Sequence, residues 1–257
     1  MPYANNDGIH IYYEVVGEGT PIVLVDGLTG SIEIWERFGY VKPLAEKYKL
    51  ILVDPRGRGK SDKPHKPVEY SMKYMVSDLV AVLDDLNIKK AVYWGYSMGG
   101  RIGLAIGKYA RKRFNALVIG GVGLIERDSQ KEIDEMKSFL ERFDNEQELI
   151  KKYMGEGWPE DFEEWNRKKW LSTDYDALRA YCKYYENIGM ADHLPKITTP
   201  CLIYAGTEDR IYAEAKNCAE IMQNAEFISF SGMGHGDAFY QRTKVLPYIL
   251  KYLEKVI

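Results

Sequence analysis

Short, almost uninterrupted apolar runs recur along the chain, and they constrain its fold more than any other feature. Each run is rich in β-branched, aromatic and other apolar side chains and is typical of a buried strand. The runs are PIVLV at 21–25, LILV at 50–53, AVYW at 91–94, ALVI at 116–119 and CLIY at 201–204. Strands are apolar throughout when helices cover both faces of their sheet. The runs therefore predict a mostly parallel sheet with two buried faces.

Stretches with helical spacing separate these runs. The clearest is 71–86, where apolar residues recur every three or four positions, and the others are 97–109, 213–222 and 245–256. A further strand is predicted at 10–16, which ends at the turn sequence Gly17-Glu18-Gly19. Alternation of strand and helix predicts an α/β fold.

The region between about Glu126 and Leu194 interrupts this alternation. It contains no convincing strand, it is charged, and it carries many Trp and Tyr residues. We interpret it as a helical cap at 125–195, inserted into a core domain made of 1–124 and 196–257, because the strand–helix rhythm resumes at Pro200. The alternative is a set of ordinary surface helices whose aromatic side chains pack on the core.

Composition excludes several classes of protein. The chain has 257 residues, 46% of them apolar and 28% charged, with a net charge of −3. This balance is typical of a globular protein, and the negative sign argues against a nucleic-acid partner. The apolar runs are too short to cross a membrane, and the polar N-terminus has no signal-peptide pattern. We therefore predict a small-molecule substrate and no membrane association; the oligomeric state is not predicted.

The cysteine and histidine patterns indicate neither a disulfide framework nor a metal site. Cys182, Cys201 and Cys218 are odd in number and widely spaced, which favours a reducing, cytoplasmic environment. The chain has no H-E-x-x-H sequence and no close His/Cys cluster. Its glycine pairs at 57/59 and 121/123 lack the remaining residues of phosphate-binding and dinucleotide-binding loops. No metal and no cofactor are predicted.

The sequence Gly95-Tyr96-Ser97-Met98-Gly99 matches G-x-S-x-G and lies between a predicted strand and a predicted helix. A serine at such a sharp turn has a strained backbone and an exposed hydroxyl group, which suits a nucleophile. The Met98 amide would lie at the helix N-terminus, pointing toward developing negative charge. The alternative is a purely structural Gly-Ser turn.

A serine nucleophile needs a base, and His235 is the best candidate of the four histidines. It lies in the glycine-rich loop GMGHG before the last helix, after every acid that could orient it. Asp209 directly follows the strand at 201–204 and is the predicted acid, with Glu208 as its nearest rival. Asp209 could also act as a helix N-cap.

The order Ser97, Asp209, His235 resembles that of the α/β-hydrolase superfamily, and the likeness covers nearly the whole chain. Residues 54–61 (DPRGRGKS) are similar to the D-x-R-G-x-G-x-S segment of that family. Asp26-Gly27-Leu28 resembles its H-G-x oxyanion loop and is followed by Trp35, where many members have a tryptophan. The resemblance implies an eight-stranded sheet, a helical cap, and an oxyanion hole formed by the Leu28 and Met98 amides.

Asp26 departs from the family pattern, which has histidine at this position. The oxyanion donor is a backbone amide, so an oxyanion hole can still form with aspartate at this position. A carboxylate turned toward the hole would oppose the developing oxyanion. We expect the Asp26 side chain to point away and to hydrogen-bond with the loop backbone.

These features predict a serine hydrolase that cleaves an ester-like bond of a small, partly apolar substrate through an acyl-enzyme intermediate. Trp158 and Tyr185 are predicted substrate contacts, since aromatic side chains offer large apolar surfaces. Asp26, in the segment that resembles the oxyanion loop, is a third predicted contact. The same site would also suit a lactonase, thioesterase, C–C bond hydrolase or perhydrolase. A signal receptor with slow hydrolysis is the alternative outside enzymology.

Overall fold

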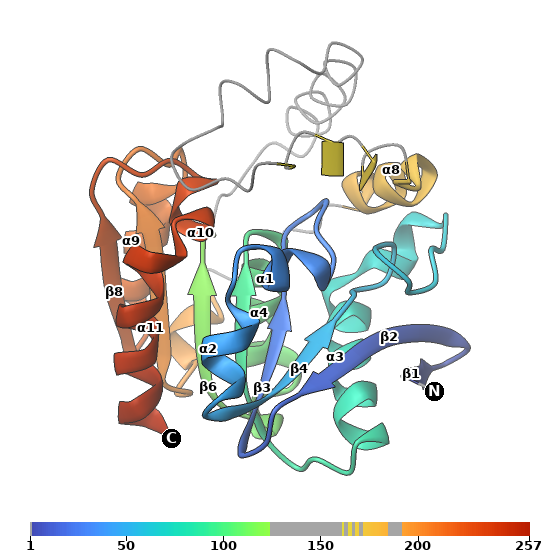
Figure 1. Cartoon of the computed structure of the whole chain (residues 1–257), viewed down its shortest axis with the longest axis horizontal. Helices are drawn as coiled ribbons and strands as arrows, with labels where there is room; N and C mark the ends of the chain where they lie inside the picture. Colours follow the sequence, from blue (N-terminus) through green and yellow to red (C-terminus); the bar gives the residue numbers. More distant parts are fainter. Residues whose placement is uncertain (1, 124–160, 162–163, 166–167, 170–171, 185–191) are drawn as a thin grey trace.

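The protein is built around one mixed, mostly parallel sheet of eight strands (Figure 1). The computed structural model describes residues 2–123, 161, 164–165, 168–169, 172–184 and 192–257. The spatial order of the strands is β1-β2-β4-β3-β5-β6-β7-β8. Their bounds are β1 Tyr3–Asn6, β2 Ile9–Val16, β3 Thr20–Val25, β4 Tyr48–Val53, β5 Ala91–Tyr96, β6 Phe114–Gly120, β7 Cys201–Gly206 and β8 Ala225–Phe230. The β1–β2 and β2–β4 pairs are antiparallel and all the others are parallel. The predicted α/β architecture is confirmed.

Helices cover both faces of the sheet, which explains the continuous apolar strands. Successive strand residues point to opposite faces, so Val23 and Val25 join one buried cluster, whereas Ile22 and Leu24 join the other. The first cluster includes α3 (Met72–Asp85), α4 (Met98–Tyr109) and α9 (Tyr212–Ile221). The second includes α1 (Glu33–Arg37), α2 (Val41–Ala45) and α11 (Arg242–Val256). Both faces are therefore hydrophobic cores.

The strand predicted at 10–16 corresponds to β2, whereas β1 and the last strand, β8, were not predicted from the sequence. β1 has the polar sequence YANN and pairs with β2 through a two-residue turn, in which Asp7 and Gly8 have φ angles of 51° and 88°. Positive φ at both central residues is typical of the turn that joins twisted antiparallel strands. β8 is an edge strand with largely half-buried side chains, so it lacks a continuous apolar run.

Helix α8 (Tyr175–Lys183) lies in the region predicted as a cap, above the carboxyl ends of the strands (Figure 1). Asp174 caps it by accepting a hydrogen bond from the Ala177 amide at 2.9 Å, and the His65 Nε2 atom lies 3.0 Å from the same carboxylate. Residues 124–160 lie outside the described residues. The cap boundaries at 125 and 195 therefore stay predictions.

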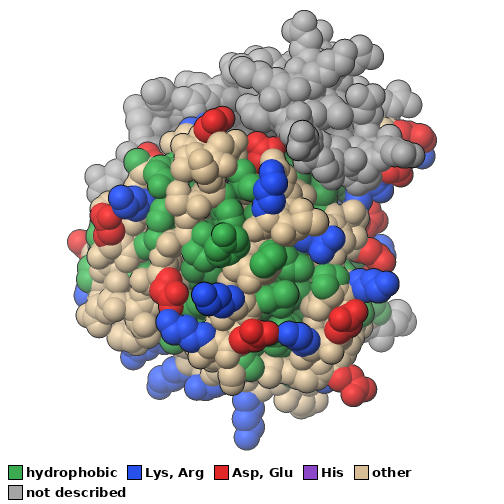
Figure 2. Space-filling view, turned by 60° about the vertical axis from the view of Figure 1, so that its left-hand side comes forward, with side chains coloured by type: hydrophobic (Ala, Val, Ile, Leu, Met, Phe, Trp, Pro, Cys, Tyr) green, Lys and Arg blue, Asp and Glu red, His purple; other side chains and the backbone are tan. Residues whose placement is uncertain are grey.

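The remaining short elements connect these parts of the fold. They are η1 (Pro67–Tyr70), η2 (Arg111–Arg113), η4 (Leu194–Lys196) and α10 (Asp237–Tyr240). Figure 2 shows the face on which β8 and α11 lie, where basic and acidic side chains are interspersed around apolar ones. None of the helices in the described ranges combines the length and apolarity needed to cross a membrane.

Candidate active site

Ser97 occupies a strained turn between β5 and α4. Its φ and ψ angles are 52° and −111°, a conformation that is costly for a residue with a side chain. The turn is held by a hydrogen bond from the Ser97 amide to the Gly120 carbonyl, at 2.8 Å, and by one from the Arg101 amide to the Ser97 carbonyl, at 2.9 Å. Strain of this kind places the serine hydroxyl group beyond the end of the strand.

Glycine is required on both sides of this serine. A Cβ atom at Gly95 would lie 2.3 Å from the Gly99 carbonyl oxygen, and one at Gly99 would lie 2.3 Å from the Val25 carbonyl oxygen. Neither obstacle is a flexible side chain. The sequence pattern therefore reflects two close backbone contacts, one within the turn and one between α4 and β3.

His235 and Asp209 complete a hydrogen-bonded chain that starts at Ser97. The His235 Nε2 atom lies 3.0 Å from the Ser97 Oγ atom, and the Nδ1 atom lies 2.7 Å from the Asp209 Oδ2 atom. The Asp209 side chain is fully buried, which favours protonation of the histidine on Nδ1, the nitrogen that faces the carboxylate. Nε2 is then free to accept the serine proton.

The loops after β7 and β8 bring Asp209 and His235 together. The Thr207 amide donates to the Phe230 carbonyl at 2.9 Å, and the Glu208 amide donates to the Met233 carbonyl at 3.0 Å. Asp209 Oδ1 also accepts a hydrogen bond from the Ile211 amide, so the carboxylate has two partners. The structure pairs His235 with Asp209, and among the described contacts of Glu208 there is none with that imidazole.

Tyr96 is a site residue that the sequence did not reveal. Its hydroxyl group donates to the His235 carbonyl at 2.5 Å, and the two rings lie 5.6 Å apart. Burial raises the pKa of Tyr96 well above its usual value, so the hydroxyl group stays protonated and can donate. Tyr96 thus fixes the loop that carries His235.

The segment that resembles an oxyanion loop lies directly against Ser97. A Cβ atom at Gly27 would be 3.2 Å from the Ser97 Cβ atom, and the Gly99 amide donates to the Asp26 carbonyl at 3.1 Å. In the described part of the chain, the Leu28 and Met98 amides have no backbone acceptor. The two amides stay the predicted donors of an oxyanion hole.

Asp26 is buried beneath this loop. Its carboxylate lies so close to Gly30 that a Cβ atom there would be 1.6 Å from Oδ2. Burial raises the pKa of Asp26 to about 6, although the Gly27 amide and the charges of Lys169 and His235 oppose the shift. The expected orientation of the Asp26 side chain, away from the oxyanion hole, stays a prediction.

Residues 54–61 support the oxyanion loop from the next strand. The Asp54 carboxylate accepts hydrogen bonds from the Ile32 and Lys60 amides, both at 2.8 Å. Ser61 donates to the Asp54 carbonyl at 2.6 Å. Arg56 forms a buried two-pronged pair with Asp78 of α3, at 2.6 and 2.7 Å. These contacts give the segment a structural role.

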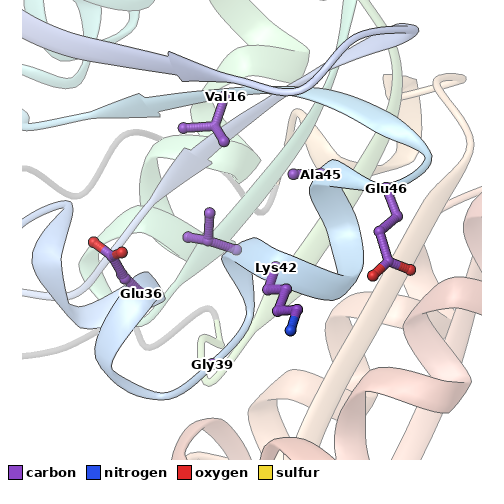
Figure 3. Close-up of a pocket in the computed structure, with 7 residues that line it drawn as sticks. Val16, Glu36, Gly39, Lys42, Ala45 and Glu46 are labelled. Carbon is purple, nitrogen blue, oxygen red and sulfur yellow. The ribbon is translucent and has the colours of Figure 1, made fainter.

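Two predicted substrate contacts, Trp158 and Tyr185, lie outside the described residues. Among the residues the structure describes, no group of three His, Cys, Asp or Glu side chains could hold a metal ion. A surface hollow lies elsewhere, beside α1 and α2 (Figure 3), and includes none of the site residues. Its lining residues are Val16, Glu36, Gly39, Val41, Lys42, Ala45 and Glu46.

A sheet of this topology with a serine at the turn after a central strand defines the α/β-hydrolase class. Residues 20–182 match the family model described as alpha/beta hydrolase fold, and the chain belongs to this family.

Known relatives agree on the fold and differ in activity. The chain is 26% identical over 259 residues to a non-heme chloroperoxidase from Streptomyces lividans, covering 90% of this chain and 91% of that protein. It is 34% identical over 119 residues to RutD of Azorhizobium caulinodans, named as a candidate carbamate hydrolase, but this match covers only 46% of this chain and 43% of that protein. An esterase structure from Exiguobacterium antarcticum has a TM-score of 0.83 and 24% identity, with 98% of each chain covered.

Proposed function

We propose that this protein is a serine hydrolase that cleaves a carboxylic ester or ester-like bond through an acyl-enzyme intermediate on Ser97. The observation that carries the proposal is the unbroken chain from the Ser97 hydroxyl group through His235 to buried Asp209, with distances of 3.0 and 2.7 Å. A serine hydroxyl group is a weak nucleophile until an adjacent base takes its proton. This geometry supplies the base and the acid that orients it.

In the first half-reaction, Ser97 Oγ attacks the substrate carbonyl carbon while its proton passes to His235 Nε2. The carbonyl oxygen becomes an oxyanion, which accepts hydrogen bonds from the Leu28 and Met98 amides. His235 then gives its proton to the leaving alcohol oxygen as the carbon–oxygen bond breaks. One oxyanion donor contributes about 3 kcal/mol to lowering the barrier in comparable sites.

In the second half-reaction, water attacks the acyl-Ser97 carbonyl carbon and loses a proton to His235 Nε2. The tetrahedral intermediate collapses, the carboxylic acid is released, and His235 returns the proton to Ser97 Oγ. Asp209 stabilises the imidazolium in both halves without taking up a proton itself.

The surroundings of Ser97 favour a partly apolar substrate. Leu28 is half-buried against a hydrophobic cluster that contains Met98, Tyr181 and Leu178. Side chains of this kind favour an apolar acyl or alcohol group, as do the predicted contacts of Trp158 and Tyr185. We also propose that residues 125–195 form a cap over this site. Cys182, Cys201 and Cys218 are buried and form no disulfide, which supports a cytoplasmic location as part of this proposal.

Steady-state hydrolysis of p-nitrophenyl acetate tests the proposal. Ser97→Ala should lower kcat by at least about 10³-fold, since the oxyanion hole alone retains little of the rate. Ser229→Ala removes an exposed serine on β8 and serves as the matched control. Retention of most activity in Ser97→Ala would refute the assignment. A panel of lactones, thioesters and esters of graded chain length then identifies the preferred substrate.

Perhydrolysis is a second candidate, favoured by the similarity to a non-heme chloroperoxidase over nine-tenths of the chain. Hydrogen peroxide would replace water as the second nucleophile and release a peroxyacid from the acyl-Ser97. Incubation with an ester and hydrogen peroxide distinguishes the two reactions. Peroxyacid formed faster than carboxylic acid would support perhydrolysis, and carboxylic acid alone would exclude it.

A further inference from the structure

Two ionisable groups at the oxyanion loop, Asp26 and Lys169, play no part in the acyl-transfer steps. Asp26 is only 6% exposed, and its carboxylate is enclosed by the turn at 27–30, in which the Gly30 amide donates to the Gly27 carbonyl at 3.1 Å. The amide of Leu28, a proposed oxyanion donor, belongs to the same turn. A negative charge inside this turn is therefore close to the place where the substrate oxyanion would form.

Lys169 reaches the turn from the region predicted as a cap. Its Nζ atom donates to the Thr29 Oγ1 atom at 3.3 Å and lies 5.1 Å from the centre of the Trp165 ring. The Ser172 and Thr173 hydroxyl groups both donate to the Lys169 carbonyl, which fixes the backbone of this residue. The half-buried ammonium group of Lys169 is thus held against the oxyanion loop.

Among the described residues, few other groups influence the pKa of Asp26. His235 and Lys169 both favour its ionised form, and the phenol groups of Tyr40, Tyr204 and Tyr240 also interact with it. Burial raises the pKa of each of these tyrosines above its usual value, so they are neutral below pH 9. Arg37, which also lies over the Trp165 ring, is paired with Asp161. Among the described cations, Lys169 and His235 are the two that act on the charge of Asp26.

We propose that Lys169 is a positioning residue of the active site, whose ammonium group holds the oxyanion loop through Thr29 and neutralises Asp26 while negative charge develops on the substrate. This inference rests on the proposed hydrolysis at Ser97. An unpaired carboxylate in a buried site opposes a nearby oxyanion, because charges interact strongly where water is excluded. The positive charge of Lys169 offsets the negative charge of Asp26. The Leu28 and Met98 amides then dominate the electrostatic field at the oxyanion.

The proposal predicts how activity responds to pH. Burial lowers the pKa of Lys169 to about 8, and burial raises the pKa of Asp26 to about 6. Both groups are therefore charged between pH 6 and 8. Above pH 8 Lys169 loses its proton while Asp26 stays ionised, so hydrolysis should decline. Below pH 6 Asp26 is neutral and does not need the lysine.

Five variants, one of them a double variant, test this account when they are assayed with neutral p-nitrophenyl acetate. Lys169→Met should lower kcat about tenfold at pH 8 and much less at pH 6, since a carboxylate that has lost its cation opposes the oxyanion only when it is ionised. Lys169→Arg should keep most of the activity and lose the decline above pH 8, because arginine remains protonated. Asp26→Asn should also abolish the alkaline decline. In the Asp26→Asn background, Lys169→Met should cost less than about twofold, because the two effects are coupled. Lys168→Met, which removes the exposed neighbouring lysine, should leave the whole profile unchanged.

Two results would overturn the inference while leaving the proposed hydrolysis intact. One is a Lys169→Met defect that is the same at pH 6 and pH 8; the other is a defect that persists in the Asp26→Asn background. Either would assign Lys169 a merely structural role. A ¹³C NMR titration of the Asp26 carboxyl group gives an answer even if the protein hydrolyses no ester: its pKa should rise in Lys169→Met, and an unchanged pKa would refute the pairing.

Discussion

At the scale of single residues, the position of His235 depends on hydrogen bonds from neighbouring residues. Asp209 orients His235 at 2.7 Å, and Tyr96 holds the carbonyl of the same histidine at 2.5 Å. Tyr96 is also the residue before the proposed nucleophile, so one turn of backbone supplies both Ser97 and a support for its base. The motif G-x-S-x-G therefore contains a functional residue at its first variable position.

Tyr96→Phe should lower kcat by up to about tenfold with little change in KM, since one buried hydrogen bond contributes about 1 kcal/mol and positions the base rather than the substrate. Steady-state kinetics with p-nitrophenyl acetate measures this split. Tyr212→Phe, which removes the hydroxyl group of an exposed pair with Ser229, is the control. A rise in KM without loss of kcat would contradict the positioning role.

The sequence predicted the residues of the Ser97–His235–Asp209 chain because their chemistry requires a particular order and local context. Asp209 was predicted as the acid, with Glu208 as its nearest rival. No sequence pattern indicated the hydrogen bond from Tyr96 to the His235 carbonyl. Lys169 was also missed, because a lysine in a charged, helical region resembles a solvated surface residue. Its contact with Thr29 spans 140 positions and depends on the folded arrangement.

At the scale of elements, the loops at the carboxyl ends of the strands are fixed by pairs that join distant segments. Arg56 and Asp78 connect the 54–61 loop to α3, and both side chains are at most 3% exposed. The Asn6 side chain donates to Asp78 Oδ1 at 2.7 Å, so the N-terminal hairpin joins the same network. The loop in turn holds the Ile32 amide next to the oxyanion segment.

Asp78→Ala should lower the free energy of unfolding by about 3–5 kcal/mol, because it leaves the Arg56 guanidinium group buried without its counterion. Urea denaturation followed by circular dichroism gives the value. The comparison variant is Glu226→Ala, which removes one partner of an exposed pair with Lys255 and should cost less than about 1 kcal/mol. Equal costs for the two variants would show that burial does not control the strength of these pairs.

The sequence predicted the strands whose two faces are both buried, because these strands are apolar throughout. It did not predict edge strands that lack such a run. β3, β5 and β7 lie inside the sheet with helices on both sides, so they had to be apolar throughout. β1 lies at an edge and contributes one fully buried residue, Ala4, so its sequence carries no such signal. The eight-stranded total followed from the family resemblance, not from the apolar runs.

At the scale of the whole molecule, the core beneath the site is an ordinary hydrophobic core, whereas the site itself contains charged groups. Two hydrophobic clusters stabilise the sheet from both faces, whereas Asp26 and Lys169 bring charges into a poorly hydrated region. Functional sites commonly cost stability in this way. The cost should therefore be measurable as a difference in unfolding free energy.

The double variant Asp26→Asn/Lys169→Met should be more stable than the wild-type protein at pH 7, by about 1–4 kcal/mol, since it removes a buried carboxylate charge and a half-buried ammonium charge. The pKa of Asp26 is raised in the folded state, so its contribution to stability is full below pH 4 and is lost as the pH rises through about 6. The stability difference should accordingly grow between pH 4 and 7. Urea denaturation at several pH values measures it, and a variant less stable at pH 7 would contradict the predicted cost.

The most direct test of the central claim is to trap the acyl-enzyme. Wild-type protein mixed with p-nitrophenyl acetate and quenched in acid within milliseconds should gain one acetyl group, and peptide mapping by mass spectrometry should locate it on Ser97. His235→Ala should acylate far more slowly under the same conditions. An acetyl group on any other residue, or hydrolysis with no covalent intermediate at Ser97, would contradict the account.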